Sequence, residues 1–285
     1  MDRKPGEHIN RLVITSNRLP IIVEKDGDSW SFIPGSGGLV TALAPVLRNR
    51  GGMWIGWPGT EEMLDVTEPL REASQSAGFT MKPVLMTREE IKNYYIGLSN
   101  EVLWPLFHDL QSYCNFDPQY WDTYRTINER FARVIKENTT DDDFIWVHDY
   151  HLINVAQELK KLEVKSKIAF FLHIPFPPLD IFFKLPWRSE ILQAFLEYDL
   201  IGFQTLRDRR NFIQCVRTLT KGVVLSGKGQ VIEARIGERR IRIGTFPISI
   251  DYNSFISMAK SREVADAAWY LHEKLPGYQI ILGID

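Results

Sequence analysis

The sequence predicts an α/β protein built on a doubly wound, mainly parallel sheet of the Rossmann-like kind. Strand-like runs alternate with helix-like stretches along most of the 285 residues, and this alternation is typical of such sheets. The run "KIAFFLHI" (167–174) is apolar throughout rather than alternating, as expected for a parallel strand that is covered on both faces. A chain of this length is also long enough to bury a sizeable core.

Strands are expected where short apolar runs end in polar or turn residues. Pro83 weakens one of these strands, because proline cannot donate a ladder hydrogen bond. The segment 229–250 has a turn near its middle, so we interpret it as a hairpin that leads into a last strand of the domain. In chain order, the expected strands are 11–16, 51–57, 79–86, 144–149, 167–175, 199–204, the hairpin within 229–250, and 278–285.

Helices are expected where apolar residues recur every three or four positions, or where a capping pattern begins the segment. Thr87 and Glu90 have the spacing of a capping box. Tyr124, Ile127 and Phe131 recur at helical spacing on one face of the third expected helix. In chain order, the expected helices are 37–49, 87–110, 121–138, 151–162, 188–197, 206–220 and 262–275.

The expected division into domains depends on the last expected strand, 278–285. We expect residues 1–250 to form one Rossmann-like domain and residues 251–285 to begin a second one. The segment "YQIILGID" has the composition of a buried strand, but no helix follows it. Because strands of this fold alternate with helices, we assign this segment to the opening of a further domain.

Composition and charge argue against several classes of protein. The chain has 34 basic and 36 acidic residues, so there is no basic excess of the kind that nucleic-acid binders show. The start "MDRKPGEHIN" lacks the apolar core of a secretory signal, and no apolar run approaches the ~20 residues of a membrane helix. Cys114 and Cys215 form no C-x-x-C pair, which fits reduced thiols. We therefore expect a cytoplasmic protein without nucleic-acid or membrane partners, and homo-oligomerisation stays open.

Polar and aromatic residues follow several of the expected strands. In open α/β sheets, ligands bind outside the carboxyl ends of the strands, so these residues can converge on one cleft. The Gly-rich turn "PGSGGL" (34–39) leads into a helix, where backbone N–H groups can hold an anion. Together these features predict a polar, phosphate-compatible cleft. The residues that follow the strands are Arg18, Trp57, His148, Asp149, His151 and His173.

Several of the candidate residues also have a structural interpretation, which the sequence leaves open. Arg18 fits an ordinary surface charge, and Asp149 fits the cap of the helix that follows it. His173 fits a core histidine at the end of an apolar strand. Tyr95 and Trp104 fit core aromatic residues of their helix.

A metal site is the other interpretation of the histidines. His148 and His151 have the spacing of a pair of metal ligands. No further His, Cys or Asp grouping completes a site at ligand spacing. We therefore expect no metal, and in particular no tightly bound zinc.

Seven segments, in this order and at these intervals, resemble the N-terminal half of the trehalose-6-phosphate synthase family. The resemblance runs from about residue 11 to the end of the chain. It implies a retaining glycosyltransferase with two Rossmann-like domains (the GT-B architecture), of which this chain carries mainly the acceptor half. The family transfers glucose from a nucleotide sugar, usually UDP-glucose, to the anomeric hydroxyl of glucose 6-phosphate, and we expect no cofactor. The segments are "SNRLP", "GSGGL", "GGMWIGWPG", "YYIGLSNEVLWPLFH", "FIWVHDYHL", "FFLHIPFPP" and "LIGFQT".

The resemblance implies roles for residues that would bind the acceptor. Arg18 matches a ligand of the acceptor phosphate, and a guanidinium suits that role because its planar fork fits phosphate oxygens. Trp57, Tyr95 and Trp104 match the wall of the acceptor pocket. Asp149 matches the carboxylate that binds acceptor hydroxyls at the catalytic centre.

The resemblance also implies roles on the donor side. Gly37 and Gly38 match a loop that closes over the donor phosphates, and His173 matches a catalytic histidine beside the transferred glucose. No side chain in the sequence is an obvious nucleophile, which agrees with the front-face attack attributed to the family.

The chain departs from the family pattern at its end. In the family, "ILGID" is followed by an Arg-Leu-Asp-Tyr-x-Lys-Gly segment whose cations neutralise the donor pyrophosphate. This sequence stops at Asp285, directly before that segment. We expect the chain by itself to fold and to bind glucose 6-phosphate weakly, but not to transfer glucose.

Two alternatives to this function stay open. A related glycosyltransferase would keep the scaffold and use a different acceptor. A non-catalytic domain that binds sugar phosphates would keep the acceptor residues and perform no transfer.

Overall fold

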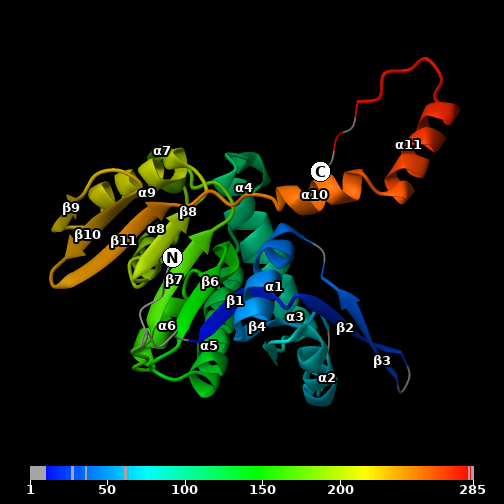
Figure 1. The fold of residues 1–285 in the computed structure, drawn as a ribbon. Coiled ribbons are helices and arrows are strands. Elements are labelled where there is room, and N and C mark those ends of the chain that lie inside the picture. The colour runs from blue at the N-terminus through cyan, green and yellow to red at the C-terminus, as the bar shows by residue number, and fades with distance from the viewer. Residues whose placement is uncertain are drawn as a thin grey trace, which may run out of the picture. The chain divides into compact units, whose positions relative to one another are not determined.

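The computed structural model describes residues 11–285, except 27–28, 36, 61–62, 64, 282 and 284–285. Its main element is a nine-stranded sheet in the order β5-β4-β1-β6-β7-β8-β11-β10-β9 (Figure 1). The neighbours from β5 to β11 are parallel, whereas β10 is antiparallel to both β11 and β9. The predicted fold class, a doubly wound and mainly parallel α/β sheet, is confirmed. The strands are β1 (Leu12–Arg18), β4 (Met53–Trp57), β5 (Thr80–Pro83), β6 (Phe144–His148), β7 (Lys167–Leu172), β8 (Leu200–Phe203), β9 (Val223–Ser226), β10 (Val231–Ile236) and β11 (Arg239–Thr245).

Helices cover both faces of this sheet (Figure 1). Successive residues of a strand point to opposite faces, and Val13 and Ile14 of β1 accordingly belong to two different hydrophobic clusters. The cluster around Val13 includes residues of α5, and the cluster around Ile14 includes residues of α1 and α2. The helices are α1 (Gly38–Arg50), α2 (Thr67–Ala77), α3 (Arg88–Glu90), η1 (Ile91–Leu103), α4 (Trp104–Phe107), η2 (Gln111–Tyr113), α5 (Pro118–Asn138), η3 (Tyr150–Leu152), α6 (Val155–Lys161), α7 (Leu179–Phe182), α8 (Arg188–Phe195) and α9 (Leu206–Leu219).

The order of the strands brings three polar chain segments to one edge of the sheet. β1 lies between β4 and β6, and β7 lies on the other side of β6. Since these strands are parallel, their carboxyl ends meet at the same edge. Arg18 at the end of β1, Asp149 after β6 and His173 after β7 are therefore neighbours in space, although up to 155 positions separate them in the chain (18 to 173).

The segment 87–110 is helical as predicted, but most of it is a π-helix. Thr87 and Glu90 form the predicted capping box at its start. From Ile91 to Leu103 the helix is π, and the N–H of Trp104 donates to the carbonyl of Ser99, five residues back. π-helices are rare and occur mostly as single turns, often at functional sites, so the length of η1 marks this segment as unusual.

The structure differs from the expected secondary structure at four places. The hairpin of β2 (Ile21–Asp26) and β3 (Ser29–Pro34) was not predicted, and neither was α2. β5 ends at Pro83 instead of continuing to residue 86, because proline cannot donate the next ladder bond. The strand expected at 278–285 is wrong for the described residues 278–281, which have no strand partner and are exposed. Residues 282 and 284–285 lie outside the described part, as does the charged start 1–10.

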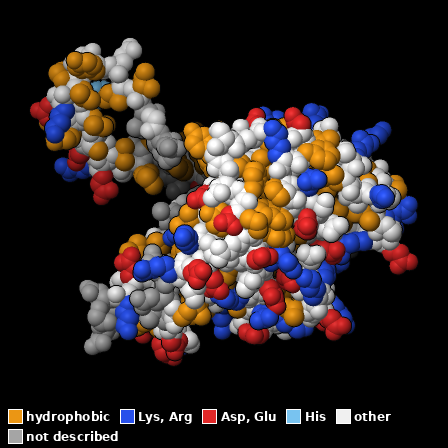
Figure 2. All heavy atoms as spheres, turned by 180° about the vertical axis from the view of Figure 1, so that it is seen from behind, with side chains coloured by type: hydrophobic (Ala, Val, Ile, Leu, Met, Phe, Trp, Pro, Cys, Tyr) orange, Lys and Arg blue, Asp and Glu red, His pale blue; other side chains and the backbone are white. Residues whose placement is uncertain are grey.

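The chain divides into two compact units, Met1–Pro247 and Ile248–Asp285. The second unit contains α10 (Tyr252–Ala259) and α11 (Arg262–Lys274), which carry exposed apolar side chains (Figure 2). On the first unit, Figure 2 shows Lys and Arg side chains interspersed with Asp and Glu. The assignment of 251–285 to the beginning of a donor-binding domain stays a prediction. None of the helices that the structure describes is long and apolar enough to span a membrane.

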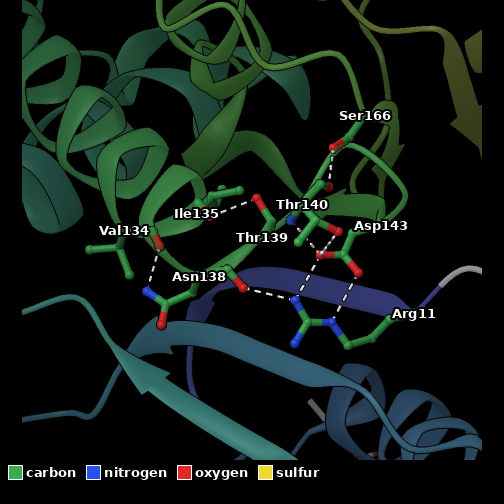
Figure 3. A network of polar contacts seen from close by, with 8 residues as sticks. All are labelled: Arg11, Val134, Ile135, Asn138, Thr139, Thr140, Asp143 and Ser166. Atoms are coloured by element: carbon green, nitrogen blue, oxygen red, sulfur yellow. Dashed lines mark hydrogen bonds and ion pairs between the residues drawn. The ribbon is translucent and has the colours of Figure 1, made fainter.

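A polar network joins the starts of β1 and β6, at the edge of the sheet opposite the polar segments (Figure 3). The Nη2 atom of Arg11 lies 2.7 Å from Oδ2 of Asp143, and Nε donates to Oδ1 at 2.9 Å. The same carboxylate accepts the backbone N–H of Thr140 at 2.7 Å, and the carbonyl of Thr140 accepts a hydrogen bond from Ser166. These bonds hold the pKa of Asp143 below its ordinary value in spite of its burial.

We expect Asp143→Ala to lower the free energy of unfolding at pH 7 by about 1–2 kcal/mol, since it removes the carboxylate that accepts from Arg11 and from the Thr140 N–H and leaves Arg11 with only the carbonyl of Asn138. The folded pKa lies below the unfolded value. This contribution is therefore present above the unfolded pKa and is lost as the pH falls through the folded pKa. Urea unfolding at pH 7 and near pH 3 measures both effects. The control is Asp142→Ala at the exposed neighbouring position, and an equal loss in this variant would contradict the role of Asp143.

Candidate active site

A cavity of about 270 Å³ lies at the carboxyl ends of β1 and β6. Among the described residues that line it, Arg18 carries the positive charge and Asp149 the negative one. Three elements therefore supply its polar groups: the end of β1, the helix η1 and the turn after β6. The lining residues are Ser16, Asn17, Arg18, Leu19, Ile22, Gly35, Gly37, Leu39, Val40, Trp54, Tyr95, His148, Asp149, Tyr150 and His151.

The guanidinium of Arg18 lies against two aromatic rings. Its Cζ atom is 4.6 Å from the ring centroid of Trp57 and 5.4 Å from that of Tyr95. The indole of Trp57 is fixed in turn, because its Nε1 donates to the carbonyl of Thr60 at 2.8 Å. No carboxylate of the described residues forms a salt bridge with Arg18. Its N–H donors are thus held in position without an acidic partner, which suits the binding of an anionic ligand.

Asp149 has a strained backbone. Its φ of 73° and ψ of 165° lie in a region that is otherwise used almost only by glycine. The bonds around it hold this conformation: its N–H donates to the carbonyl of Phe171 at 2.8 Å, and its Oδ1 accepts the backbone N–H of His173 at 3.2 Å. Strain of this kind clusters at functional sites, so the geometry favours a functional role of Asp149 over simple helix capping.

Burial raises the pKa of Asp149 to about 6, although the backbone N–H groups of Tyr150, His173 and Ile174 oppose this shift. At pH 7 the side chain is therefore mostly ionised, but its negative charge is costly to hold in the site. A ligand that offers hydroxyl donors would relieve this cost.

The raised pKa predicts that Asp149→Asn is more stable than the wild type at pH 7. A folded pKa above the unfolded value contributes stability that is present below pH 4 and is lost as the pH rises through about 6. Asparagine keeps the shape and accepts positive φ values more readily than most residues. We therefore expect a gain on the order of 1–2 kcal/mol at pH 7 that vanishes near pH 4. Urea unfolding at both pH values measures it, and a gain that does not depend on pH would contradict the titration of Asp149.

His151 stacks on Tyr95, with ring centroids 5.7 Å apart and an angle of 17° between the planes. Both of its ring nitrogens are buried and have no hydrogen-bond partner in the described part of the chain. Burial, with a further contribution from the charge of Arg18, lowers the pKa of His151 to about 3. His151 is therefore a neutral ring that supports Tyr95. The described residues contain no group of three or more His, Cys, Asp and Glu side chains placed to hold a metal.

The Gly-rich turn reaches the same cavity. Gly37 lines it with a φ of 138°, and a Cβ atom built there would have nothing within 4 Å. Gly38 is the first residue of α1, and it is not among the lining residues. The backbone at Gly37 is thus open to the cavity at the beginning of a helix, where the helix dipole favours an anion.

Trp104 is a predicted site residue that lies apart from this cavity. It is 40% exposed and stacks on His108, with ring centroids 4.2 Å apart. His108 lines a second cavity of about 490 Å³ together with residues of the loop after β7. Of the predicted site residues, Arg18, Tyr95, Asp149 and Gly37 line the first cavity. Trp57 and His173 are not among the lining residues, but Trp57 contacts Arg18, and His173 contacts Asp149 and His148.

Several lining residues inside the motifs were not predicted as site residues, and two of them, Asn17 and Tyr150, form side-chain hydrogen bonds. Tyr150 belongs to "HDYH", and its hydroxyl donates to Oδ1 of Asn100 at 2.9 Å. Asn17 belongs to "SNR", and its Oδ1 accepts the hydroxyl of Tyr94 at 3.0 Å. Because both stand next to a predicted residue, inspection of the neighbours of Arg18 and Asp149 could have identified them.

Comparison with known proteins supports the sequence resemblance. The family model described as Glycosyltransferase family 20 matches residues 10–285. The chain is 38% identical over 279 residues to the trehalose-6-phosphate synthase of Mycolicibacterium vanbaalenii, covering 96% of this chain and 57% of that protein. It is also 38% identical over 285 residues to that of Mycobacterium tuberculosis (strain H37Rv), covering 96% and 56%.

Solved structures show the same fold. The UDP-forming α,α-trehalose-phosphate synthase of Burkholderia xenovorans in complex with glucose 6-phosphate has a TM-score of 0.77 and 30% identity, covering 93% of this chain and 56% of that one. An E. coli structure described as trehalose-6-phosphate bound with UDP-2-fluoro glucose has a TM-score of 0.73 and 31% identity, covering 92% and 54%. The chain thus spans a little over half the length of the relatives that it matches.

Proposed function

Because this chain belongs to glycosyltransferase family 20, we propose that it carries the acceptor half of an enzyme that makes trehalose 6-phosphate. That enzyme would transfer glucose, with retention of configuration, from a nucleotide sugar to glucose 6-phosphate. The observation that carries the proposal is the pairing of Arg18 and Asp149 in one cavity, with a free cationic donor group and a half-buried carboxylate.

Arg18 is proposed to bind the phosphate of the acceptor. A phosphate monoester is a dianion that accepts bidentate hydrogen bonds from a guanidinium. The rings of Trp57 and Tyr95 hold this guanidinium and offer flat apolar faces beside it. A sugar ring has such faces as well, so the same group of residues suits both parts of a sugar phosphate.

Asp149 is proposed to bind hydroxyls of the acceptor sugar. Burial raises the pKa of this carboxylate because it removes water from around the charge. Hydroxyl groups of a bound sugar would donate hydrogen bonds to the carboxylate in place of that water. Its oxygen is already oriented by the backbone N–H of His173. Asp149 is the carboxylate among the described lining residues, and its proposed role is binding rather than nucleophilic attack.

Gly37, Gly38 and His173 are proposed to face the donor. The open backbone at Gly37 suits the close approach of a phosphate. His173 is joined to Asp149 through its backbone N–H, so donor-side and acceptor-side residues meet at one point. Such an arrangement would hold two substrates in contact, which by itself accounts for a large part of catalysis.

Calorimetry with the 285-residue chain tests the acceptor assignment. Glucose 6-phosphate, glucose 1-phosphate, fructose 6-phosphate and glucose are titrated in parallel. We expect glucose 6-phosphate to bind best and glucose, which lacks the phosphate, to bind below detection. A preference for another sugar phosphate would favour a related glycosyltransferase, and no binding of any phosphate would overturn the proposal.

The transfer step needs a separate measurement. Formation of trehalose 6-phosphate from UDP-glucose or GDP-glucose is followed by mass spectrometry. The assay uses this chain alone and this chain joined to the C-terminal remainder of a matched relative. Product from the joined protein would support the enzyme. Binding of glucose 6-phosphate without product in either form would favour a non-catalytic sugar-phosphate domain.

A further inference from the structure

Two histidines from neighbouring strands contact each other beside the cavity. The Nδ1 atom of His148, the last residue of β6, lies 3.0 Å from the Nε2 atom of His173, which follows β7. At this distance the two nitrogens share a hydrogen bond, in which one is a protonated donor and the other an unprotonated acceptor. The direction of this hydrogen bond decides which nitrogen of His173 carries a proton.

Both rings are neutral at physiological pH. Burial lowers the pKa of His173 to about 4. Burial also lowers the pKa of His148 well below its ordinary value, and the neighbouring His173 lowers it further. Each ring thus carries one proton, so only two arrangements of the pair are open.

The surroundings of His148 distinguish these two arrangements. His148 is 1% exposed, and its Nε2 atom is buried without a hydrogen-bond partner in the described part of the chain. If His148 accepted the bond at Nδ1, its own proton would lie on Nε2 as an orphaned N–H donor, which is rare in protein interiors. If His148 donates from Nδ1, its Nε2 carries no proton, and this penalty is avoided.

We propose that His148 is a positioning residue: it donates from Nδ1 to Nε2 of His173 and thereby holds His173 in the tautomer that carries its proton on Nδ1. His173 then offers an N–H donor on the ring side that does not contact His148. No described residue forms a hydrogen bond with that nitrogen. The use of this donor, for an oxygen of a bound sugar, rests on the proposed function, whereas the tautomer itself does not.

Nitrogen NMR of the ligand-free 285-residue chain, labelled with ¹⁵N-histidine, tests the proposal. Protonated and bare ring nitrogens resonate far apart, and long-range couplings to the ring protons identify which is which. The signals of His173 are assigned by their loss in His173→Asn. We expect the wild type to show a protonated Nδ1 and a bare Nε2 at His173.

Two substitutions of His148 separate positioning from mere packing. His148→Leu removes the donor, so His173 should lose the Nδ1–H signature and shift to the Nε2–H form that isolated imidazole side chains prefer. His148→Asn places an amide N–H close to the former Nδ1, so it should restore the Nδ1–H form. His272→Asn, at an exposed position on α11, is the matched control and should leave His173 unchanged.

A protonated Nε2 at His173 in the wild type would overturn the proposal, even if neither variant of His148 folds. So would an unchanged tautomer in a folded His148→Leu protein. Because the tautomer is measured without ligand, either outcome is independent of whether glucose 6-phosphate binds.

Discussion

Phe176→Ala is expected to lower the free energy of unfolding by about 3–5 kcal/mol, the range for removing a fully buried phenylalanine ring. Phe176 is 0% exposed and lies in the loop between β7 and α7. Its ring contacts aromatic rings from five different elements, so no single neighbour can move to fill the cavity that alanine leaves. These rings belong to Phe107 of α4, Phe182 of α7, Phe195 of α8, Phe203 of β8 and Phe212 of α9.

The same substitution should also loosen the chain near His173. The backbone of Phe176 is held by Asp208, which accepts its N–H at 3.2 Å, and by Asn211, which donates to its carbonyl at 2.9 Å. These bonds and the buried ring together fix the loop that begins at His173. Weaker binding of ligands at the cavity would therefore accompany the loss of stability.

Urea unfolding followed by circular dichroism measures the effect of Phe176→Ala. The control is Phe183→Ala, a nearby phenylalanine on the surface that is 41% exposed, for which we expect a loss of about 1 kcal/mol or less. Equal losses in the two variants would show that the aromatic cluster around Phe176 contributes no special stability.

The second large effect is expected from Arg18→Ala, which should weaken the binding of glucose 6-phosphate by about 1.5–3 kcal/mol, roughly 10- to 150-fold in Kd. The substitution removes the cation of the cavity, and no lysine or other arginine is among the described lining residues. The cost to folding should be small, because the side chain of Arg18 is exposed and forms no salt bridge with a described carboxylate.

Arg18→Lys separates charge from geometry. Lysine keeps the positive charge but lacks the planar fork, so we expect an intermediate affinity. The control is Arg217→Ala, which removes an exposed arginine at the end of α9 and should leave binding unchanged. Calorimetric titration measures the affinity of each variant for glucose 6-phosphate, and an unfolding curve checks that each variant is folded. Unchanged affinity in a folded Arg18→Ala protein would remove Arg18 from the site.

The π-helix shows how a correct local prediction can still misplace side chains. The capping box at Thr87 and Glu90 correctly predicted the start of this helix, but it could not reveal the π register of Ile91–Leu103. Tyr95 lies within η1 and lines the cavity, whereas Trp104 begins α4 and stacks on His108.

The histidines illustrate the same limit. His148 and His151 have the spacing of a metal pair, an interpretation that the sequence analysis did not favour. The hydrogen-bond partner of His148 is instead His173, which lies 25 positions away and directly follows the neighbouring strand β7. His151 instead stacks on Tyr95 of η1. Sequence spacing could not reveal either contact, because both depend on the order of the strands in the sheet and on the helix that covers its edge.

The sequence by itself determined the α/β class, most of the strands and helices, and the family. These features depend on local patterns of apolar residues and on motifs whose order survives in the chain. Only the tertiary structure decided which polar groups meet, the strained φ of Asp149, the π register of η1 and the lack of a strand at 278–281. Each of these is set by contacts between residues far apart in the chain: β6 beside β7 fixes Asp149, and 278–281 have no neighbouring strand with which to pair.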